Sequence, residues 1–186
     1  MFIKYMNEIL VSIIIPSFNE EDDIKRTLEN IYIQLKNKEN FELIIVDDST
    51  DNTTKIIYEF KKKFSKLIVD KKEYRRGLAK ACNDGVKLSN GDYICIINAD
   101  NILEENFIEN LEKILKKNKA IKVLSTLNTV ANNNSFFGSY VDLQNKYRLR
   151  SDDHIFRLIN SNFISFTEGF VVKKKNIFRI WWNTSN

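Results

Sequence analysis

Glycine and proline are scarce in this 186-residue sequence, which holds five glycines and one proline. Residues 11–24 contain no glycine. This counts against the glycine-rich triphosphate loop of a nucleotidyl transferase and excludes an ordinary dinucleotide-binding fingerprint. No proline- or glycine-rich linker divides the chain, and 43% of its residues are hydrophobic. We therefore expect one domain with a proper core over residues 1–186.

Cysteine and histidine are also rare. Cys82 and Cys95 fall inside an expected helix and an expected strand without metal-ligand spacing, so we expect two reduced core side chains. A reducing compartment follows, and we expect a cytoplasmic protein. The single histidine, His154, is expected to be a surface turn residue rather than a ligand.

Long apolar runs are missing. The stretch at residues 9–15 stops at Pro16, short of the roughly 18 residues that a membrane span needs, and no signal cleavage pattern follows. The net charge is +4, and the lysine runs, such as residues 61–63, are typical of solvated helix faces. We expect no nucleic-acid partner, while peripheral association with the inner face of a membrane stays open.

Apolar strands alternate with amphipathic helices over the first 127 residues. We expect strands at residues 11–15, 43–46, 67–69, 93–97 and 121–127, and helices at residues 22–35, 51–64, 78–88 and 104–117. The strands are continuously apolar, so both of their faces must be buried. The pattern predicts an α/β fold with a Rossmann-like, mostly parallel central sheet and helices on both faces.

After residue 127 this alternation ends. Residues 141–158 are interpreted as a charged helix interrupted near Ser151, and residues 163–173 as two short strands around Glu168. The apolar residues 177–182 then have no helix to cover them, so the chain looks C-terminally incomplete.

Polar residues follow three of the expected strands, at residues 16–20, 47–51 and 98–101. Ligands of parallel sheets bind beyond the carboxyl ends of the strands, so Asp48 could accept hydrogen bonds from a base or ribose. Asp100 could hold Mg²⁺ or Mn²⁺, which take carboxylate oxygens and share their shell with phosphates. Taken singly, these aspartates could equally be turn and helix-capping residues.

Four segments occur in order at fitting intervals: residues 11–21, 45–51, 76–85 and 91–100. The series resembles the inverting glycosyltransferases of family 2, which have the GT-A fold and use nucleotide sugars. The resemblance covers residues 11–127 well and residues 160–182 loosely. It implies a nucleotide-sugar-binding part at residues 1–127 and a partial acceptor-side part at residues 128–186.

The resemblance also implies residue roles. Asp48 is the family's base-reading carboxylate, Arg76 and Gly77 form its Arg-Gly step near the diphosphate, and Asp100 is its metal-binding aspartate. The expected donor-binding residues are Pro16, Ser17, Asn19, Glu20, Asp47, Asp48, Arg75, Arg76, Gly77, Asn83, Asn98 and Ala99. The implied partners are a nucleotide-sugar donor and a glycan or lipid-linked acceptor, and the implied cofactor is Mg²⁺ or Mn²⁺.

Two departures from the family pattern matter. The metal motif is usually Asp-x-Asp, whereas Asn98 stands at its first position here. The loss of a carboxylate should weaken metal binding. The family's Glu-Asp pair, which supplies the catalytic base, would follow the last residues of this chain. Glu168 is the preferred internal substitute, ahead of Asp152 or Asp153.

Two functions therefore compete: an active glycosyltransferase, and a nucleotide-sugar-binding module without turnover. Both require that the side chains of Asp48 and Asp100 converge on one pocket.

Overall fold

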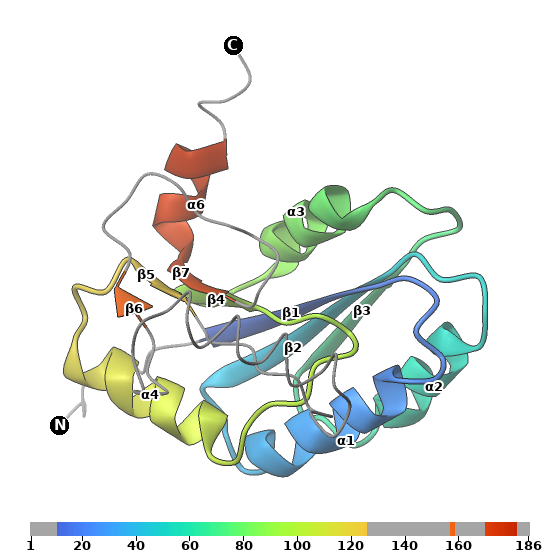
Figure 1. Cartoon of the computed structure of the whole chain (residues 1–186), viewed down its shortest axis with the longest axis horizontal. Coiled ribbons are helices and arrows are strands. Elements are labelled where there is room, and N and C mark those ends of the chain that lie inside the picture. The colour runs from blue at the N-terminus through green and yellow to red at the C-terminus, as the bar shows by residue number, and fades with distance from the viewer. Residues whose placement is uncertain (1–10, 126–156, 159–169, 182–186) are drawn as a thin grey trace, which may run out of the picture.

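The computed structural model describes residues 11–125, 157–158 and 170–181 (Figure 1). Within this part, the order along the chain begins β1 (Val11–Ser17), α1 (Ile24–Leu35), β2 (Phe41–Asp47), α2 (Thr53–Phe60), β3 (Leu67–Lys71), α3 (Leu78–Leu88), β4 (Tyr93–Ile96) and α4 (Phe107–Lys117). It continues with β5 (Val123–Ser125), β6 (Arg157–Leu158), β7 (Phe170–Lys173) and α6 (Lys174–Trp181).

The described strands form one seven-stranded sheet in the order β3-β2-β1-β4-β7-β5-β6. The pairs β1·β2, β1·β4 and β2·β3 are parallel, whereas β7 is antiparallel to both β4 and β5. Because β7 lies between them, β5 points in the same direction as β4. The expected mostly parallel α/β sheet is confirmed, with β6 and β7 as its reversed strands.

Both faces of the sheet are covered, as expected from the continuously apolar strands. Along β1, Ile13 and Ile15 belong to one core cluster and Ile14 to a second, and all three are fully buried. The first cluster lies under α1, α2 and α4, and the second under α3 and α6 (Figure 1). Alternate residues of each strand thus face opposite helical layers.

Helix α3 approaches the sheet closely at Gly85. A Cβ atom built at Gly85 would lie 2.5 Å from Cγ2 of Ile14. The absence of a side chain at residue 85 therefore sets the distance between α3 and β1, and with it the position of the first turn of α3.

The C-terminal expectations need correction. Residues 157–158 form strand β6 and do not belong to a helix, and the apolar tail is itself the helix α6, which buries Ile177 in the second core. The second of the two strands expected at residues 163–173 is β7. Glu168 lies outside the described residues, and so do residues 141–156 of the expected helix. The two cysteines are free and buried, as expected, and burial raises the pKa of Cys82 to about 11 and that of Cys95 to about 12.

Candidate donor site at the strand ends

The carboxyl ends of β1, β2 and β4 meet at one edge of the sheet because the three strands are parallel. Their loops and the start of α3 enclose a pocket of about 290 Å³, called here the strand-end pocket. Its lining residues are Pro16, Ser17, Phe18, Glu20, Asp48, Arg75, Gly77, Leu78, Ala81, Asn98, Ala99 and Asp100. Asp48 and Asp100 thus line the same pocket although they are far apart in the sequence.

The carboxylate of Asp48 is held by Arg76. Its Oδ2 atom accepts the backbone N–H of Arg76 at 2.7 Å, and its Oδ1 atom accepts Nη2 at 2.9 Å and Nε at 3.3 Å. Asp48 is 2% exposed, so the pair is largely shielded from water. A carboxylate offers about four lone-pair sites, so Oδ2 keeps capacity for a further donor.

Asp84 of α3 completes this arrangement from the other side. It forms ion pairs with the guanidinium of Arg76 and, at 2.7 Å, with Lys80. Burial opposes the charge on Arg76, but the hydrogen bonds and charges of Asp48 and Asp84 outweigh it and raise the pKa of Arg76. The hydrogen bond from Lys80, aided by Arg76, lowers the pKa of Asp84 against the effect of burial. The β3–α3 loop is therefore fixed to the end of β2 by charge-assisted bonds.

Negative charge gathers at the opposite end of the pocket. Burial raises the pKa of Glu20, and the charges of Asp100, Asp23 and Asp51 raise it further. The described residues contain no cluster of three His, Cys, Asp or Glu side chains that could hold a metal. A cation here would therefore rely on Asp100, its neighbours and oxygens supplied by a ligand.

Ser17 has an unsatisfied hydroxyl. Its residue is 4% exposed, it lines the pocket, and its buried Oγ has no hydrogen-bond partner within the part of the chain that the structure describes. Buried polar groups are normally paired, so this hydroxyl is suited to hydrogen-bond a ligand in the pocket.

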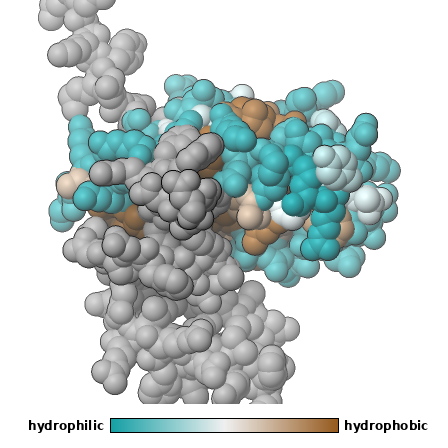
Figure 2. All heavy atoms as spheres, turned by 90° about the horizontal axis from the view of Figure 1, so that it is seen from above, coloured by the Kyte–Doolittle hydropathy of each residue, from teal (hydrophilic) through white to brown (hydrophobic). Residues whose placement is uncertain are grey.

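Cationic and apolar side chains form the outer part of the pocket. The guanidinium carbon of Arg75 lies 4.2 Å from the ring centroid of Phe18, a cation–π contact that orients the arginine. Leu78, at the start of α3, is 54% exposed although it lines the pocket. Figure 2 views the molecule from the α3 side and shows a mostly hydrophilic surface with a few apolar spots.

Four of the expected site residues do not line the pocket: Asn19, Asp47, Arg76 and Asn83. Asp47 is fully buried and accepts the backbone N–H of Ser49 at 3.1 Å and the hydroxyl of Thr54 at 2.5 Å. Asn19, at a φ of 56°, accepts the backbone N–H of Thr50 at 2.8 Å. These two residues hold the loops after β1 and β2 together.

Arg76 does not line the pocket but holds the lining residue Asp48 by hydrogen bonds. Asn83 lies on α3. Phe18 lines the pocket within the turn at residues 16–20, and Leu78 and Ala81 line it without having been expected there. The spacing of Leu78 and Ala81, three residues apart on an expected helix, is the sequence signal that could have found them.

The seven-stranded, mostly parallel sheet with a polar pocket at its strand ends defines an α/β protein of the GT-A type. The chain belongs to glycosyl transferase family 2, whose family model matches residues 12–180. No helix in the described ranges is long and apolar enough to cross a membrane.

Two curated relatives illustrate the similarity. A dolichyl N-acetyl-alpha-D-glucosaminyl phosphate 3-beta-D-2,3-diacetamido-2,3-dideoxy-beta-D-glucuronosyltransferase of Methanococcus voltae is 42% identical over 103 residues, which are 54% of this chain and 32% of that protein. The UDP-Glc:alpha-D-GlcNAc-diphosphoundecaprenol beta-1,3-glucosyltransferase WfgD of Escherichia coli is 34% identical over 137 residues, 73% of this chain and 52% of that protein. The chain thus spans between a third and about half of these relatives.

Solved structures share the fold. TarS 1-349 of S. aureus in complex with UDP-GlcNAc matches with a TM-score of 0.70 and 21% identity, over 91% of this chain and 46% of that one. The mannosyltransferase PcManGT of Pyrobaculum calidifontis, in complex with GDP-Man and Mn²⁺, matches with a TM-score of 0.67 and 22% identity, over 95% of this chain and 48% of that one.

Proposed function

We propose that the strand-end pocket binds a nucleoside-diphosphate sugar, a UDP- or GDP-sugar, and that the protein transfers the sugar with inversion to a glycan or lipid-linked acceptor. We place this activity in the cytoplasm, at the inner face of the membrane. The observation that carries the proposal is the convergence of Asp48 and Asp100 on one pocket. Family membership and the nucleotide-sugar complexes of two proteins with the same fold support it.

The base and ribose of the donor fit the end of the pocket formed by Pro16, Ser17 and Asp48. Oδ2 of Asp48 is suited to accept an N–H of the base, and the unpaired hydroxyl of Ser17 is suited to a ribose or base atom. Asn19, Asp47 and Arg76 serve this end indirectly, because they fix the loops that carry the lining residues.

The diphosphate fits between the start of α3 and Asp100. Gly77 and Leu78 place the amino end of α3 at the pocket, where backbone N–H groups favour an anion, and Arg75 adds a positive charge. We assign Asn83, which lies on the same helix, to this end as well.

The acidic end fits a divalent cation. Burial raises the pKa of Glu20 and the charge of Asp100 raises it further, and a cation would relieve the repulsion between these two carboxylates. Asp100 would hold Mg²⁺ or Mn²⁺, with Asn98, Ala99 and Glu20 beside it and phosphate oxygens completing the shell. The cation would neutralise the charge of the departing diphosphate.

Transfer is an in-line displacement in which the acceptor oxygen bonds to the anomeric carbon while the bond to the diphosphate breaks. A base must take the proton of the acceptor hydroxyl. We propose Glu168 for this role. The alternative is a nucleotide-sugar-binding module without turnover, which the replacement of a metal-motif carboxylate by Asn98 favours.

A thermal-shift experiment with UDP and GDP, with and without Mn²⁺, tests the donor site. A nucleotide at about 100 times its Kd should raise Tm by roughly 5 °C or more. Asp100→Ala should remove the part of the shift that needs Mn²⁺, and Asp92→Ala, at an exposed carboxylate outside the pocket, is the control. An Asp100→Ala protein that responds to Mn²⁺ like the wild type would refute the metal assignment.

Turnover separates the two functions. A transferase releases nucleoside diphosphate from a nucleotide sugar, and Glu168→Gln should slow this release by on the order of 100-fold or more. A binding module shows the same thermal shifts without any product, and Glu168→Gln changes nothing.

A further inference from the structure

A second pocket lies at the opposite edge of the sheet, where β2 begins. Its volume is about 360 Å³, larger than that of the strand-end pocket. Its walls come from the end of α1, the α1–β2 loop, the first residues of β2 and the segment after α2. The lining residues are Tyr32, Leu35, Lys36, Asn37, Lys38, Glu39, Phe41, Leu43, Lys63, Phe64, Ser65 and Lys66. We call it the lysine pocket.

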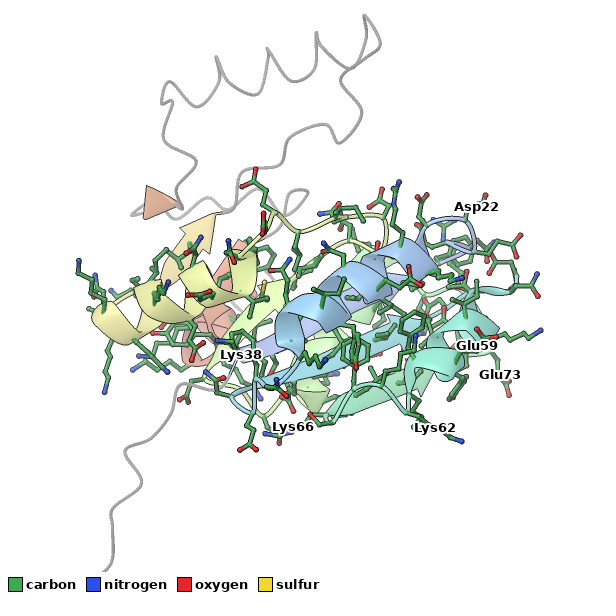
Figure 3. All side chains as sticks on the ribbon, turned by 90° about the horizontal axis from the view of Figure 1, so that it is seen from below. Asp22, Lys38, Glu59, Lys62, Lys66 and Glu73 are labelled. Atoms are coloured by element: carbon green, nitrogen blue, oxygen red, sulfur yellow. The ribbon has the colours of Figure 1, made fainter. Side chains whose placement is uncertain are left out.

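The lining of the lysine pocket carries four ammonium groups, those of Lys36, Lys38, Lys63 and Lys66, against the single carboxylate of Glu39. Figure 3 shows Lys38 and Lys66 on the same side of the molecule. In the whole chain, basic residues barely outnumber acidic ones, at 29 to 25. In the lining of the lysine pocket, by contrast, basic residues are in clear excess.

Most of this positive charge is not neutralised by the residues that the structure describes. Lys38 pairs with Glu112 at 2.6 Å, but no ion pair in the described ranges involves Lys36, Lys63 or Lys66. The ammonium of Lys66 donates to the backbone carbonyl of Glu39, and that of Lys63 lies 4.3 Å from the ring centroid of Phe60. Neither contact supplies a negative charge, and an ammonium has three donors.

The walls beneath the lysines are rigid and partly aromatic. Tyr32 and Phe64 meet edge to face with their centroids 5.5 Å apart, and Phe41 and Leu43 form the buried floor. The hydroxyl of Ser65 and the amide of Asn37 add hydrogen-bonding groups to the rim. The pocket therefore offers neutral donors beside its cations and apolar surface below them.

We propose that the lysine pocket binds a phosphate group, and that this phosphate belongs either to an anionic phospholipid or to a soluble phosphorylated compound. Several mobile ammonium groups around a concave surface favour a compact, multiply charged oxyanion over a single carboxylate. Each lysine near an anionic membrane surface contributes about 1 kcal/mol, so the cluster is suited to a lipid surface as well.

This second site is independent of the donor site. The lysine pocket is at the amino end of β2 and the strand-end pocket is at its carboxyl end, a distance of about 20 Å for a seven-residue strand. No residue lines both pockets. Vesicle or phosphate binding can therefore fail while the donor site stands, and the reverse also holds.

The test uses the full chain and a pair of double variants with the same change in net charge. Lys36→Glu/Lys63→Glu reverses the charge of two exposed lysines of the lysine pocket that have no ion pair within the described ranges. Lys25→Glu/Lys55→Glu reverses the charge of two exposed lysines outside the pocket, one on α1 and one on α2. Binding is measured by co-sedimentation with phosphatidylglycerol vesicles and by thermal shift with pyrophosphate. A pyrophosphate effect that survives in the pocket variant belongs to the donor site.

The lipid source predicts vesicle binding that falls at least about tenfold in the pocket variant and much less in the control. The soluble source predicts no vesicle binding and a pyrophosphate shift that only the pocket variant loses. If neither probe binds, or if the two double variants lose binding equally, the lysine pocket has no special affinity for phosphate and the proposal is wrong.

A gain-of-binding variant guards against unfolding as the explanation. Glu112→Gln removes the carboxylate that pairs with Lys38 and should strengthen binding by the responding probe severalfold. Circular dichroism and a sedimentation run without vesicles exclude misfolding and aggregation as the cause of such a gain. Unchanged or weaker binding in a folded Glu112→Gln protein would contradict the proposed role of the lysine charges.

Discussion

Asp48 and Arg76 show how a single carboxylate can be both buried and available. Three hydrogen bonds from Arg76 offset the cost of burying Asp48, which still lines the pocket and whose Oδ2 atom keeps capacity for a further donor. The sequence places Asp48 at the strand end but does not reveal its partner. Arg76 was expected near the diphosphate, whereas the structure makes it the support of the carboxylate.

Arg76→Ala should lower the free energy of unfolding by about 3 kcal/mol, because it leaves a largely buried carboxylate with one hydrogen bond. Urea denaturation measures this change. Arg26→Ala is the matched control, since its ion pair with Asp23 is exposed and should contribute less than about 0.5 kcal/mol. Equal losses in the two variants would show that the buried pair contributes no more to stability than an exposed pair.

Helix α3 packs against the sheet without room for a side chain at one position. Its first turn lines the strand-end pocket, and Gly85, two turns later, allows close contact with Ile14. Gly85 is the last residue of the segment 76–85 that carries the family resemblance, and the packing gives this glycine a physical reason. It allows the close approach of α3 to β1.

Gly85→Ala should destabilise the protein by about 1–3 kcal/mol, although alanine favours helices, because its Cβ would overlap Ile14 Cγ2. Thermal unfolding of the single and double variants measures the effect. Ile14→Ala removes the clashing atom, so the double variant should lose less stability than the sum of the two single changes. Strict additivity would mean that the close approach to Ile14 is not the cause.

At the scale of the whole molecule, the central part of the fold followed from the sequence because each strand is apolar on both faces and each helix has one apolar face. Beyond residue 125, the described part of the chain followed from the sequence only at the strand that forms β7. Strand β7 inserts between β4 and β5, a long-range pairing that no local periodicity encodes. Helix α6 was missed because its apolar residues were interpreted as an uncovered tail, whereas Ile177 reaches the core from a helix.

The candidate site divides in the same way. Strand ends are predictable, so the convergence of Asp48 and Asp100 could be expected from the order of the strands alone. The loop contacts are not, because they depend on which side chain of each turn faces inward. Asp47 and Asp48 are neighbours of the same residue type, yet one fixes a loop through Thr54 and the other lines the pocket.

The response of the whole molecule to acid follows from its partly buried carboxylates. For Glu112, hydrogen bonds from Lys116, Lys38 and Asn40 outweigh burial and lower the pKa to about 2. Glu42 is also lowered against burial, by hydrogen bonds from Ser12 and Asn90. Because their folded pKa values lie below the ordinary value of 4.5, both groups stabilise the fold above pH 4.5, and each contribution is lost as pH falls from 4.5 through the folded pKa of that group.

Glu20 acts in the opposite direction. Its raised pKa means that ionising it costs folding free energy, so its effect is a loss of stability as pH rises from 4.5 through its folded pKa. Two tightly hydrogen-bonded glutamates should outweigh one partly exposed glutamate. We therefore expect the free energy of unfolding, measured by urea denaturation, to be lower at pH 3 than at pH 7.

Two variants, one double and one single, separate these contributions. The change from pH 7 to pH 3 should shrink by about 2 kcal/mol in Glu42→Gln/Glu112→Gln, after allowance for the partial exposure of the lysine partners. Glu20→Gln should instead enlarge the change, because it removes a group whose ionisation lowers the free energy of unfolding as pH rises. If the double variant kept the full acid sensitivity of the wild type, Glu42 and Glu112 would not be its source. Asp84 and Asp51, whose pKa values are also lowered, would then be the next carboxylates to test.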